Sequence, residues 1–287
     1  MALAAVGRDQ SAGQGKVEVD AIMPPMVQRA QQKCDAGANN PLMVNSVQKA
    51  FRVLTVFSRT EPRLTLTQIV EKLDIDKSTA QRFTHTLLAM GYLDKDAVTK
   101  TLGVTVKMLD LAHLYLSSNP LIASAMPYLI HLNGETGETV NLTVLDGTEV
   151  VFVSRLVGSN LLSTGVIMGT RLPAFATASG LAMMSMLPEP EIKRLIKSSN
   201  LQAFTPSTVY EPAKLMERLK VAKAKGYVLG VGDFFANDIS LGAPIMSRSG
   251  QVQGAVSLSV AIDRYTPKEA ETKFAKVVSA AAKSILV

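Results

Sequence analysis

The chain has 287 residues, of which 47% are hydrophobic, and a formal net charge of +6; its length favours two compact domains over one, each with its own core. Cys34 is the single cysteine, which excludes an intrachain disulfide and a cysteine-built zinc site, and no apolar run approaches the roughly twenty residues of a transmembrane helix. The N-terminus lacks the basic start and apolar block of a secretory signal, so we expect a cytoplasmic protein.

The first 42 residues are rich in Gln, Gly, Ala and Pro and show little periodicity, so residues 1–42 are predicted to be a disordered extension. The first periodic segment, 44–57, is predicted to be an amphipathic helix that supports the domain after it. Its apolar stripe is expected to consist of Val47, Ala50, Phe51, Leu54 and Phe57.

Residues 64–103 follow the order of elements of a winged helix-turn-helix. Thr65 is placed to cap a helix over 66–73, and Ile75 is the buried centre of the turn that follows. Asp76 is placed to cap a second helix over 77–90, which Gly91 ends as a left-handed residue. Two short strands, 92–94 and 101–104, would then form the wing. A winged helix-turn-helix lays its second helix in the DNA major groove.

The second helix of this motif has a polar face without acidic residues. The same face on an isolated helix would more often be plain solvated surface, but the turn spacing, the glycine stop and the hairpin favour DNA recognition here. Its polar side chains can bond to phosphates or base edges, and two wing lysines can reach the neighbouring backbone. The predicted residues that bind double-stranded operator DNA are Thr65, Lys77, Ser78, Thr79, Gln81, Arg82, His85, Lys95 and Lys100.

The predicted DNA-binding domain spans residues 43–104, and a linker helix follows over 105–118. Val104, Met108, Leu111 and Tyr115 recur at spacings of four, three and four, which gives this helix an apolar seam. The seam could be buried within the monomer or against a second copy. Because a regulator that reads a two-fold operator needs a second copy, we favour a homodimer contact.

Residues 119–287 form the second predicted domain. A helix starts at Asn119-Pro120 and runs to about 133, and two strands over 139–155 are joined by Asp146-Gly147. A loop over 158–173 precedes helices over 177–186, 189–199 and 212–225. A second hairpin over 239–261 precedes a last helix, which opens with a capping box at Thr266. Strand pairs between helices predict an α+β domain with an antiparallel sheet.

Over about residues 45–287, the chain resembles transcriptional regulators of the IclR (isocitrate lyase regulator) family. The resemblance is carried by SVQKAFRVLTVF, by KSTAQRFTHTL running into GYL, by Leu102-Gly103, and by GETVNLTVLDG, RLPAFATASGLA, AKGYVLG and APIMSRSGQVQGAVSLSV. It implies a winged helix-turn-helix joined by a linker helix to a GAF-like effector-binding domain. It also implies dimers that often pair into tetramers, and regulation of catabolic operons, most commonly repression, in response to small organic or aromatic acids.

A candidate effector pocket combines one strand with one helix start. In the strand 251–261, Ser257 and Ser259 lie on the face opposite the apolar residues, and buried hydroxyls need partners; bonds to the local backbone or to water are the alternative. The start of the helix near 178 offers free backbone amides to an anion. The resemblance adds Gly230 and Ser240, whose positions belong to the effector site of the family. The expected effector-binding residues are therefore Ala178, Ser179, Gly180, Gly230, Ser240, Ser257 and Ser259.

Two of these positions depart from the family members that bind small keto acids. Those members carry an acidic residue where this chain has Gly230, and a cysteine where it has Ser240. Glycine is expected to open space and remove a charge, which favours a bulkier ligand such as an aromatic acid, an amide or a related catabolite. Met168, Met183 and Met184 could line such a pocket, although methionines in such segments are more often core.

No catalytic or cofactor motif is present. His85, His113 and His131 lie on predicted helices without a carboxylate at triad or ligand spacing, and the sequence lacks a P-loop, GxSxG, HExxH or GxGxxG. We therefore expect no enzyme activity, no cofactor and no metal. The alternative is a GAF-like small-molecule-binding enzyme or sensor whose N-terminal domain mediates protein contacts. A helix that only docks on another protein would not need the basic, acid-free face of residues 77–85, so we favour the DNA-binding regulator.

Overall fold

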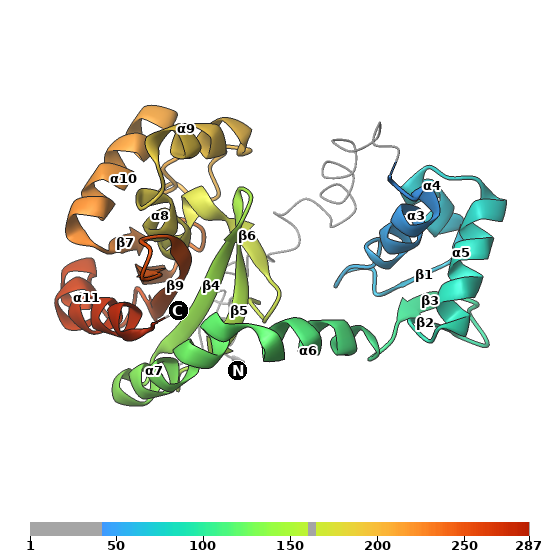
Figure 1. Cartoon of the computed structure of the whole chain (residues 1–287), viewed down its shortest axis with the longest axis horizontal. Coiled ribbons are helices and arrows are strands. Elements are labelled where there is room, and N and C mark those ends of the chain that lie inside the picture. The colour runs from blue at the N-terminus through green and yellow to red at the C-terminus, as the bar shows by residue number, and fades with distance from the viewer. Residues whose placement is uncertain (1–41, 160–164, 287) are drawn as a thin grey trace, which may run out of the picture.

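A computed structural model describes residues 42–159 and 165–286 (Figure 1). The predicted N-terminal extension lies outside the described residues, apart from Leu42. Two domains are joined by a single helix, so the predicted two-domain architecture is confirmed. No helix of the described residues combines the length and apolar character needed to cross a membrane.

The N-terminal domain is a winged helix-turn-helix. Its helices are α3 (Asn45–Leu54), α4 (Leu66–Leu73) and α5 (Lys77–Ala89), and its strands β1 (Arg63–Leu64), β2 (Leu93–Lys95) and β3 (Leu102–Val104) pair in the order β1-β3-β2. Thr65 caps α4 in a capping box with Gln68, and Asp76 caps α5 through the Thr79 amide at 2.8 Å. The wing therefore has three strands; β1 is too short to leave a periodic signal.

The apolar stripe predicted for the first helix is partly wrong. Val53, Val56 and Phe57 pack into the core of the domain, whereas Val47 and Phe51 are 53% and 59% exposed. The helix is apolar on two sides, and the periodicity alone did not distinguish the side that meets α4 and α5 from the side that faces outwards.

The linker helix α6 (Met108–Ser118) has no buried residue. It runs as a rod between the two domains and ends at Asn119, whose extended backbone (φ −84°, ψ 113°) separates it from α7 (Pro120–Thr136) (Figure 1). The Asn119 side chain caps α7 by accepting from the Leu121 amide at 3.0 Å. The seam of α6 is thus not buried within the monomer.

The C-terminal domain is built on one six-stranded antiparallel sheet. The strands lie in the order β6-β5-β4-β9-β8-β7 and comprise β4 (Thr139–Asp146), β5 (Glu149–Leu156), β6 (Arg171–Pro173), β7 (Val228–Val231), β8 (Asp238–Met246) and β9 (Val252–Ala261). Strands β6 and β7 were not predicted, because β6 lies inside the predicted loop and β7 has four residues.

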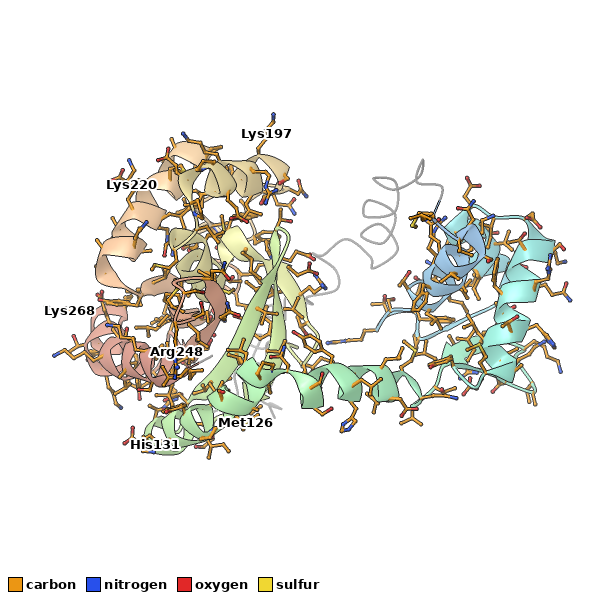
Figure 2. All side chains as sticks on the ribbon, viewed as in Figure 1. Met126, His131, Lys197, Lys220, Arg248 and Lys268 are labelled. Carbon is orange, nitrogen blue, oxygen red and sulfur yellow. The ribbon has the colours of Figure 1, made fainter. Side chains whose placement is uncertain are left out.

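Helices cover both faces of the sheet. On one face lie α7 and α11 (Pro267–Ser284), packed on apolar strand residues such as Val256, Leu258 and Val260. On the other face lies α8 (Ala178–Ser185), entered through the short turn η1 (Ala174–Ala176), with α9 (Glu189–Ser198) and α10 (Pro212–Lys225) outside it (Figure 1). The outer faces of α9, α10 and α11 carry charged side chains, among them Lys197, Lys220 and Lys268 (Figure 2).

Candidate functional site

The outer face of α5 is polar and open to solvent. Ser78, Arg82 and His85 recur at spacings of four and three residues, so they share one face of the helix, and Lys77 and Gln81 are exposed beside them. Thr79, also predicted to bind DNA, is half-buried. This face is compatible with the major groove, where arginine and glutamine pair with base edges.

Two acidic side chains near this face are held by the backbone. The Asp76 carboxylate accepts from the Thr79 amide, and hydrogen bonding by the side chain and then the amide of Thr79 lowers the pKa of Asp76. Asp96 accepts from the amides of Val98 and Thr99, which lowers its pKa as well. Both carboxylates therefore stay ionised and cap backbone amides, Asp76 at the start of α5 and Asp96 in the wing.

The other predicted DNA-binding residues lie around this helix. Lys95 ends β2 on the exposed side of the wing, and Lys100 holds a left-handed backbone (φ 58°) and donates to the Ala97 carbonyl at 2.7 Å. The Thr65 hydroxyl is engaged in its cap. Arg63 on β1 links this strand to β2 by donating to Asp94 at 2.6 Å.

A second candidate site is a cavity of about 50 Å³ between the sheet and α8. Six of the seven predicted effector-binding residues line it; the exception is Gly180. The cavity lining consists of Asn141, Phe152, Arg155, Val166, Leu172, Ala176, Thr177, Ala178, Ser179, Gly230, Asp233, Phe234, Phe235, Asp238, Ser240, Ser257 and Ser259. Because the open space is small, a ligand with an aromatic ring has to displace some of these side chains.

The floor of the cavity is a row of polar side chains across neighbouring strands. Arg155 donates to Asn141 Oδ1 at 2.9 Å, and Asn141 donates to Ser257 Oγ at 3.4 Å. These three residues stand opposite one another on β5, β4 and β9. On the next row Ser240 and Ser259 lie 3.1 Å apart and are register partners. The hydroxyls of Ser257 and Ser259, predicted to share one face of the strand, both line the cavity.

The start of α8 forms the roof of the cavity. Thr177 caps the helix by accepting from the Gly180 amide at 3.2 Å, so the preceding amides of Ala178 and Ser179 have no acceptor within the helix. Gly180 is a packing residue, since a Cβ there would lie 2.2 Å from the Ala174 carbonyl oxygen. Gly242 on β8 allows the same close approach, with a Cβ only 2.5 Å from the Ala178 carbonyl carbon.

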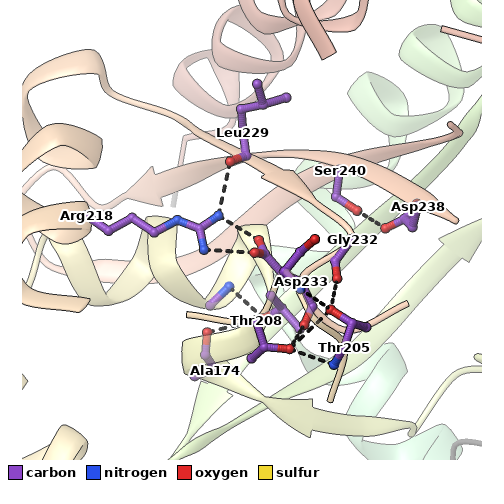
Figure 3. Close-up of polar contacts among 12 residues, drawn as sticks. Ala174, Thr205, Thr208, Arg218, Leu229, Gly232, Asp233, Asp238 and Ser240 are labelled. Carbon is purple, nitrogen blue, oxygen red and sulfur yellow. Dashed lines mark hydrogen bonds and ion pairs between the residues drawn. The ribbon is translucent and has the colours of Figure 1, made fainter. Parts of the chain in front are cut away.

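Two acidic residues that were not predicted as site residues lie at one end of the cavity. Asp233 is 8% exposed and is bound by both terminal nitrogens of Arg218, at 2.6 and 2.9 Å, while Arg218 also donates to the Leu229 carbonyl (Figure 3). Asp238 accepts a short hydrogen bond from Ser240 (Figure 3). Burial raises the pKa of Asp238 to about 7 and lowers that of Arg155, and these two groups attract each other across the cavity.

The expectation that Gly230 opens space is wrong. A Cβ at this position would lie 2.7 Å from the Asp233 carboxylate, so Asp233 already fills the space beside it, and the negative charge is present after all. Met183 and Met184 belong to the core around α8, Met168 is 52% exposed, and none of the three lines the cavity.

Phe234 and Phe235 form an aromatic wall in the cavity lining, and Phe204 packs on Phe234 from outside the lining. The rings of Phe204 and Phe234 are 4.7 Å apart, and those of Phe234 and Phe235 are 4.8 Å apart. Among the described residues, no group of three or more His, Cys, Asp or Glu side chains is placed to hold a metal ion. The arrangement thus combines an anion-binding helix start, hydroxyls, one arginine and an apolar wall, which suits an organic acid.

Comparisons with known proteins match both domains of the chain. Residues 113–287 match the family described as bacterial transcriptional regulator IclR C-terminal, and residues 46–97 match the IclR helix-turn-helix domain. The chain is 28% identical over 266 residues to the Pca regulon regulatory protein of Pseudomonas putida, covering 92% of this chain and 91% of that one.

Two further matches involve another curated relative and a solved structure. The p-hydroxybenzoate hydroxylase transcriptional activator of Acinetobacter baylyi is 29% identical over 225 residues, 77% of this chain and 82% of that one. A transcriptional regulator from Rhodococcus sp. RHA1, solved by crystallography, has a TM-score of 0.76 and 29% identity, covering 85% of this chain and 97% of that one.

Proposed function

Because the chain belongs to the IclR family of bacterial transcriptional regulators, we propose that it represses a catabolic operon and that a small organic or aromatic acid in the C-terminal cavity controls it. The observation that carries this proposal is the coexistence, in one chain, of an acid-free helix exposed on a winged helix-turn-helix and a cavity with a row of polar side chains. The enzyme alternative is set aside, since the matching relatives are transcriptional regulators.

The proposed ligand class follows from the chemistry of the cavity. Free amides at the start of α8, the Ser257 hydroxyl and Arg155 supply donors for a carboxylate, and the phenylalanine wall supplies a surface for an apolar body. Two relatives are named for the Pca regulon and for p-hydroxybenzoate hydroxylase, which adds support for an aromatic acid. In this proposal Ala178, Ser179, Gly230, Ser240 and the two strand serines contact the acid.

Replacing the two strand serines should separate ligand response from DNA binding. In the double variant Ser257→Val and Ser259→Val, we expect operator affinity to stay within about twofold of the wild type, because both residues lie far from α5. The rise in melting temperature that short-chain or aromatic acids produce should be lost, since a ligand stabilises only the state that binds it. Thermal shift and gel shift on the same preparations measure the two properties.

The matched control for this pair is Ser249→Val, which changes an exposed hydroxyl in the β8–β9 turn. It should respond to acids like the wild type. A double variant that keeps the full thermal shift would place the effector elsewhere.

We further propose a homodimer held in part by α6. Leu111 and Leu114 are 43% and 64% exposed and lie on the same side of this helix as Tyr115. An apolar patch of this kind on a polar protein indicates an interaction surface. A dimer would place two recognition helices on the two halves of a palindromic operator.

Charges introduced into this patch should dissociate the dimer. For Leu111→Glu with Leu114→Glu we expect a shift from dimer to monomer at micromolar concentration, because the buried contact would then hold carboxylates without partners. Size-exclusion chromatography with light scattering measures the mass. His113→Glu changes the opposite, polar side of α6 and should leave the mass unaltered. A dimer that survives both leucine substitutions would remove α6 from the interface.

A further inference from the structure

The two carboxylate oxygens of Asp238 differ in their hydrogen bonding within the described part of the chain. Its Oδ2 accepts from Ser240, but Oδ1 is buried and has no hydrogen-bond partner among the described residues. A buried acceptor without a donor costs about 1–3 kcal/mol, so proteins seldom keep one without a reason. Asp238 also lines the cavity, at the start of β8 and close to Ser240 and Ser259.

The groups around Asp238 are already committed to other partners. Arg218 is occupied by Asp233 and by the Leu229 carbonyl. Arg155 donates to Asn141 and attracts Asp238 electrostatically, without a hydrogen bond to Oδ1. If Ser240 gives its single hydrogen to Asp238, Ser259 must donate to Ser240, so neither serine has a hydrogen left for Oδ1. The donor that Oδ1 lacks must come from outside this set.

The rest of the cavity has the opposite requirement. The amides of Ala178 and Ser179 have no acceptor within α8, and Ser257, which accepts from Asn141, keeps its own hydrogen, so all three are donors available to a carboxylate. One end of the cavity is therefore complementary to an acid, and the Asp238 end is complementary to a hydrogen-bond donor. A simple acid without a further polar group would satisfy the first end only.

We propose that Asp238 selects the effector: the ligand is an organic acid that also carries a hydroxyl group, and this hydroxyl donates to Asp238 Oδ1. The inference rests on the proposed function, since it assumes that an acid occupies this cavity. It goes further by naming the second functional group of the ligand and the residue that recognises it. A site with a buried acceptor discriminates strongly against the analogue that lacks the donor.

Matched pairs of acids test this assignment on the full chain. The probes are benzoate against 3- and 4-hydroxybenzoate, and propionate against lactate, with affinity measured by calorimetry. In the wild type we expect the hydroxylated member of at least one pair to bind about tenfold more tightly, the effect of one hydrogen bond to a buried acceptor that otherwise lacks a partner. In Asp238→Leu this preference should fall to within about twofold, while Asp238→Asn keeps the shape and part of the preference.

Leucine in place of Asp238 removes the unpartnered oxygen, but it is larger than aspartate and also removes the acceptor of Ser240, so the melting temperature of this variant is measured first. If Asp238→Leu does not fold, Asp238→Asn, which keeps the size of the carboxylate, carries the test: its preference for the hydroxylated acid should be smaller than that of the wild type. Asp263→Leu, at an exposed position after β9, is the control and should keep the wild-type preference. Equal affinity within every pair, or a preference that survives in Asp238→Leu, overturns the role of Asp238 but leaves an acid-responsive regulator. If no probe binds at millimolar concentration, the proposed function fails together with the inference.

Discussion

Operator binding should be lost when Arg82 is replaced by alanine. Arg82 is exposed in the middle of α5, on the face shared with Ser78 and His85, and has no acidic neighbour within its helix. One arginine contact to a base or a phosphate contributes about 1–3 kcal/mol, and a dimer loses it twice, so the expected loss is about 2–6 kcal/mol. A gel shift with the operator fragment, at fixed salt, measures this loss.

The fold and the oligomeric state should be untouched in this variant, because an exposed arginine contributes little to stability. Lys193→Ala supplies the matched control: it removes an exposed cation of α9, paired with Glu189 at 2.7 Å, at a distance from α5. Its operator affinity should equal that of the wild type. Unchanged binding by Arg82→Ala would show that α5 is not the recognition helix.

Gly242→Ala should be strongly destabilising although it adds a single methyl group. The new Cβ would lie 2.5 Å from the carbonyl carbon and 2.6 Å from the carbonyl oxygen of Ala178, and backbone atoms cannot rotate away. Either α8 lifts from the sheet or β8 bends, at a cost of about 3 kcal/mol or more. For a domain of this size such a loss lowers the melting temperature by roughly 10 °C. The response to acids should be lost as well, because α8 forms the roof of the cavity.

Gly134→Ala is the opposite case and serves as the control. Gly134 lies inside α7 with no atom within 4 Å of the added Cβ. Alanine there should stabilise the protein by up to about 1 kcal/mol, the difference in helix propensity. Calorimetric melting of both variants makes the comparison. A melting temperature of Gly242→Ala equal to that of the wild type would mean that α8 and β8 adjust without cost.

The N-terminal domain was predictable from its sequence because its determinants are local. A threonine three residues before a glutamine, an aspartate before a lysine, and a glycine after a helix each act within one turn of chain. Thr65, Asp76 and Gly91 occupy the predicted positions in the structure. The prediction of the apolar stripe on the first helix was wrong because burial there depends on tertiary packing and not on local sequence. Whether Val47 or Val53 is buried depends on the packing of α4 and α5, which no local pattern contains.

The cavity was only half predictable. The alternation along β9 placed Ser257 and Ser259 together on one face, and the structure confirms this. Asn141 and Arg155 could have been noticed as polar residues inside apolar strands, but nothing in the sequence pairs them with Ser257. Asp233 and Asp238 lie in a connection and at a strand start, where acids are common, so their role appears only when burial and the Arg218 pair are known.

The bare linker helix has a consequence for how operators and regulators change together. An α-helix advances about 1.5 Å and turns about 100° for each residue, so a one-residue insertion in α6 would rotate the whole DNA-binding domain by about 100° relative to the C-terminal domain. An insertion of seven residues restores the phase but moves the domain about 10 Å further out. In the proposed dimer, changes in the length of α6 would therefore be tolerated only in steps close to whole helical turns, so the spacing of the two half-sites could change only in the same steps. The sequence of each half-site could change one base at a time.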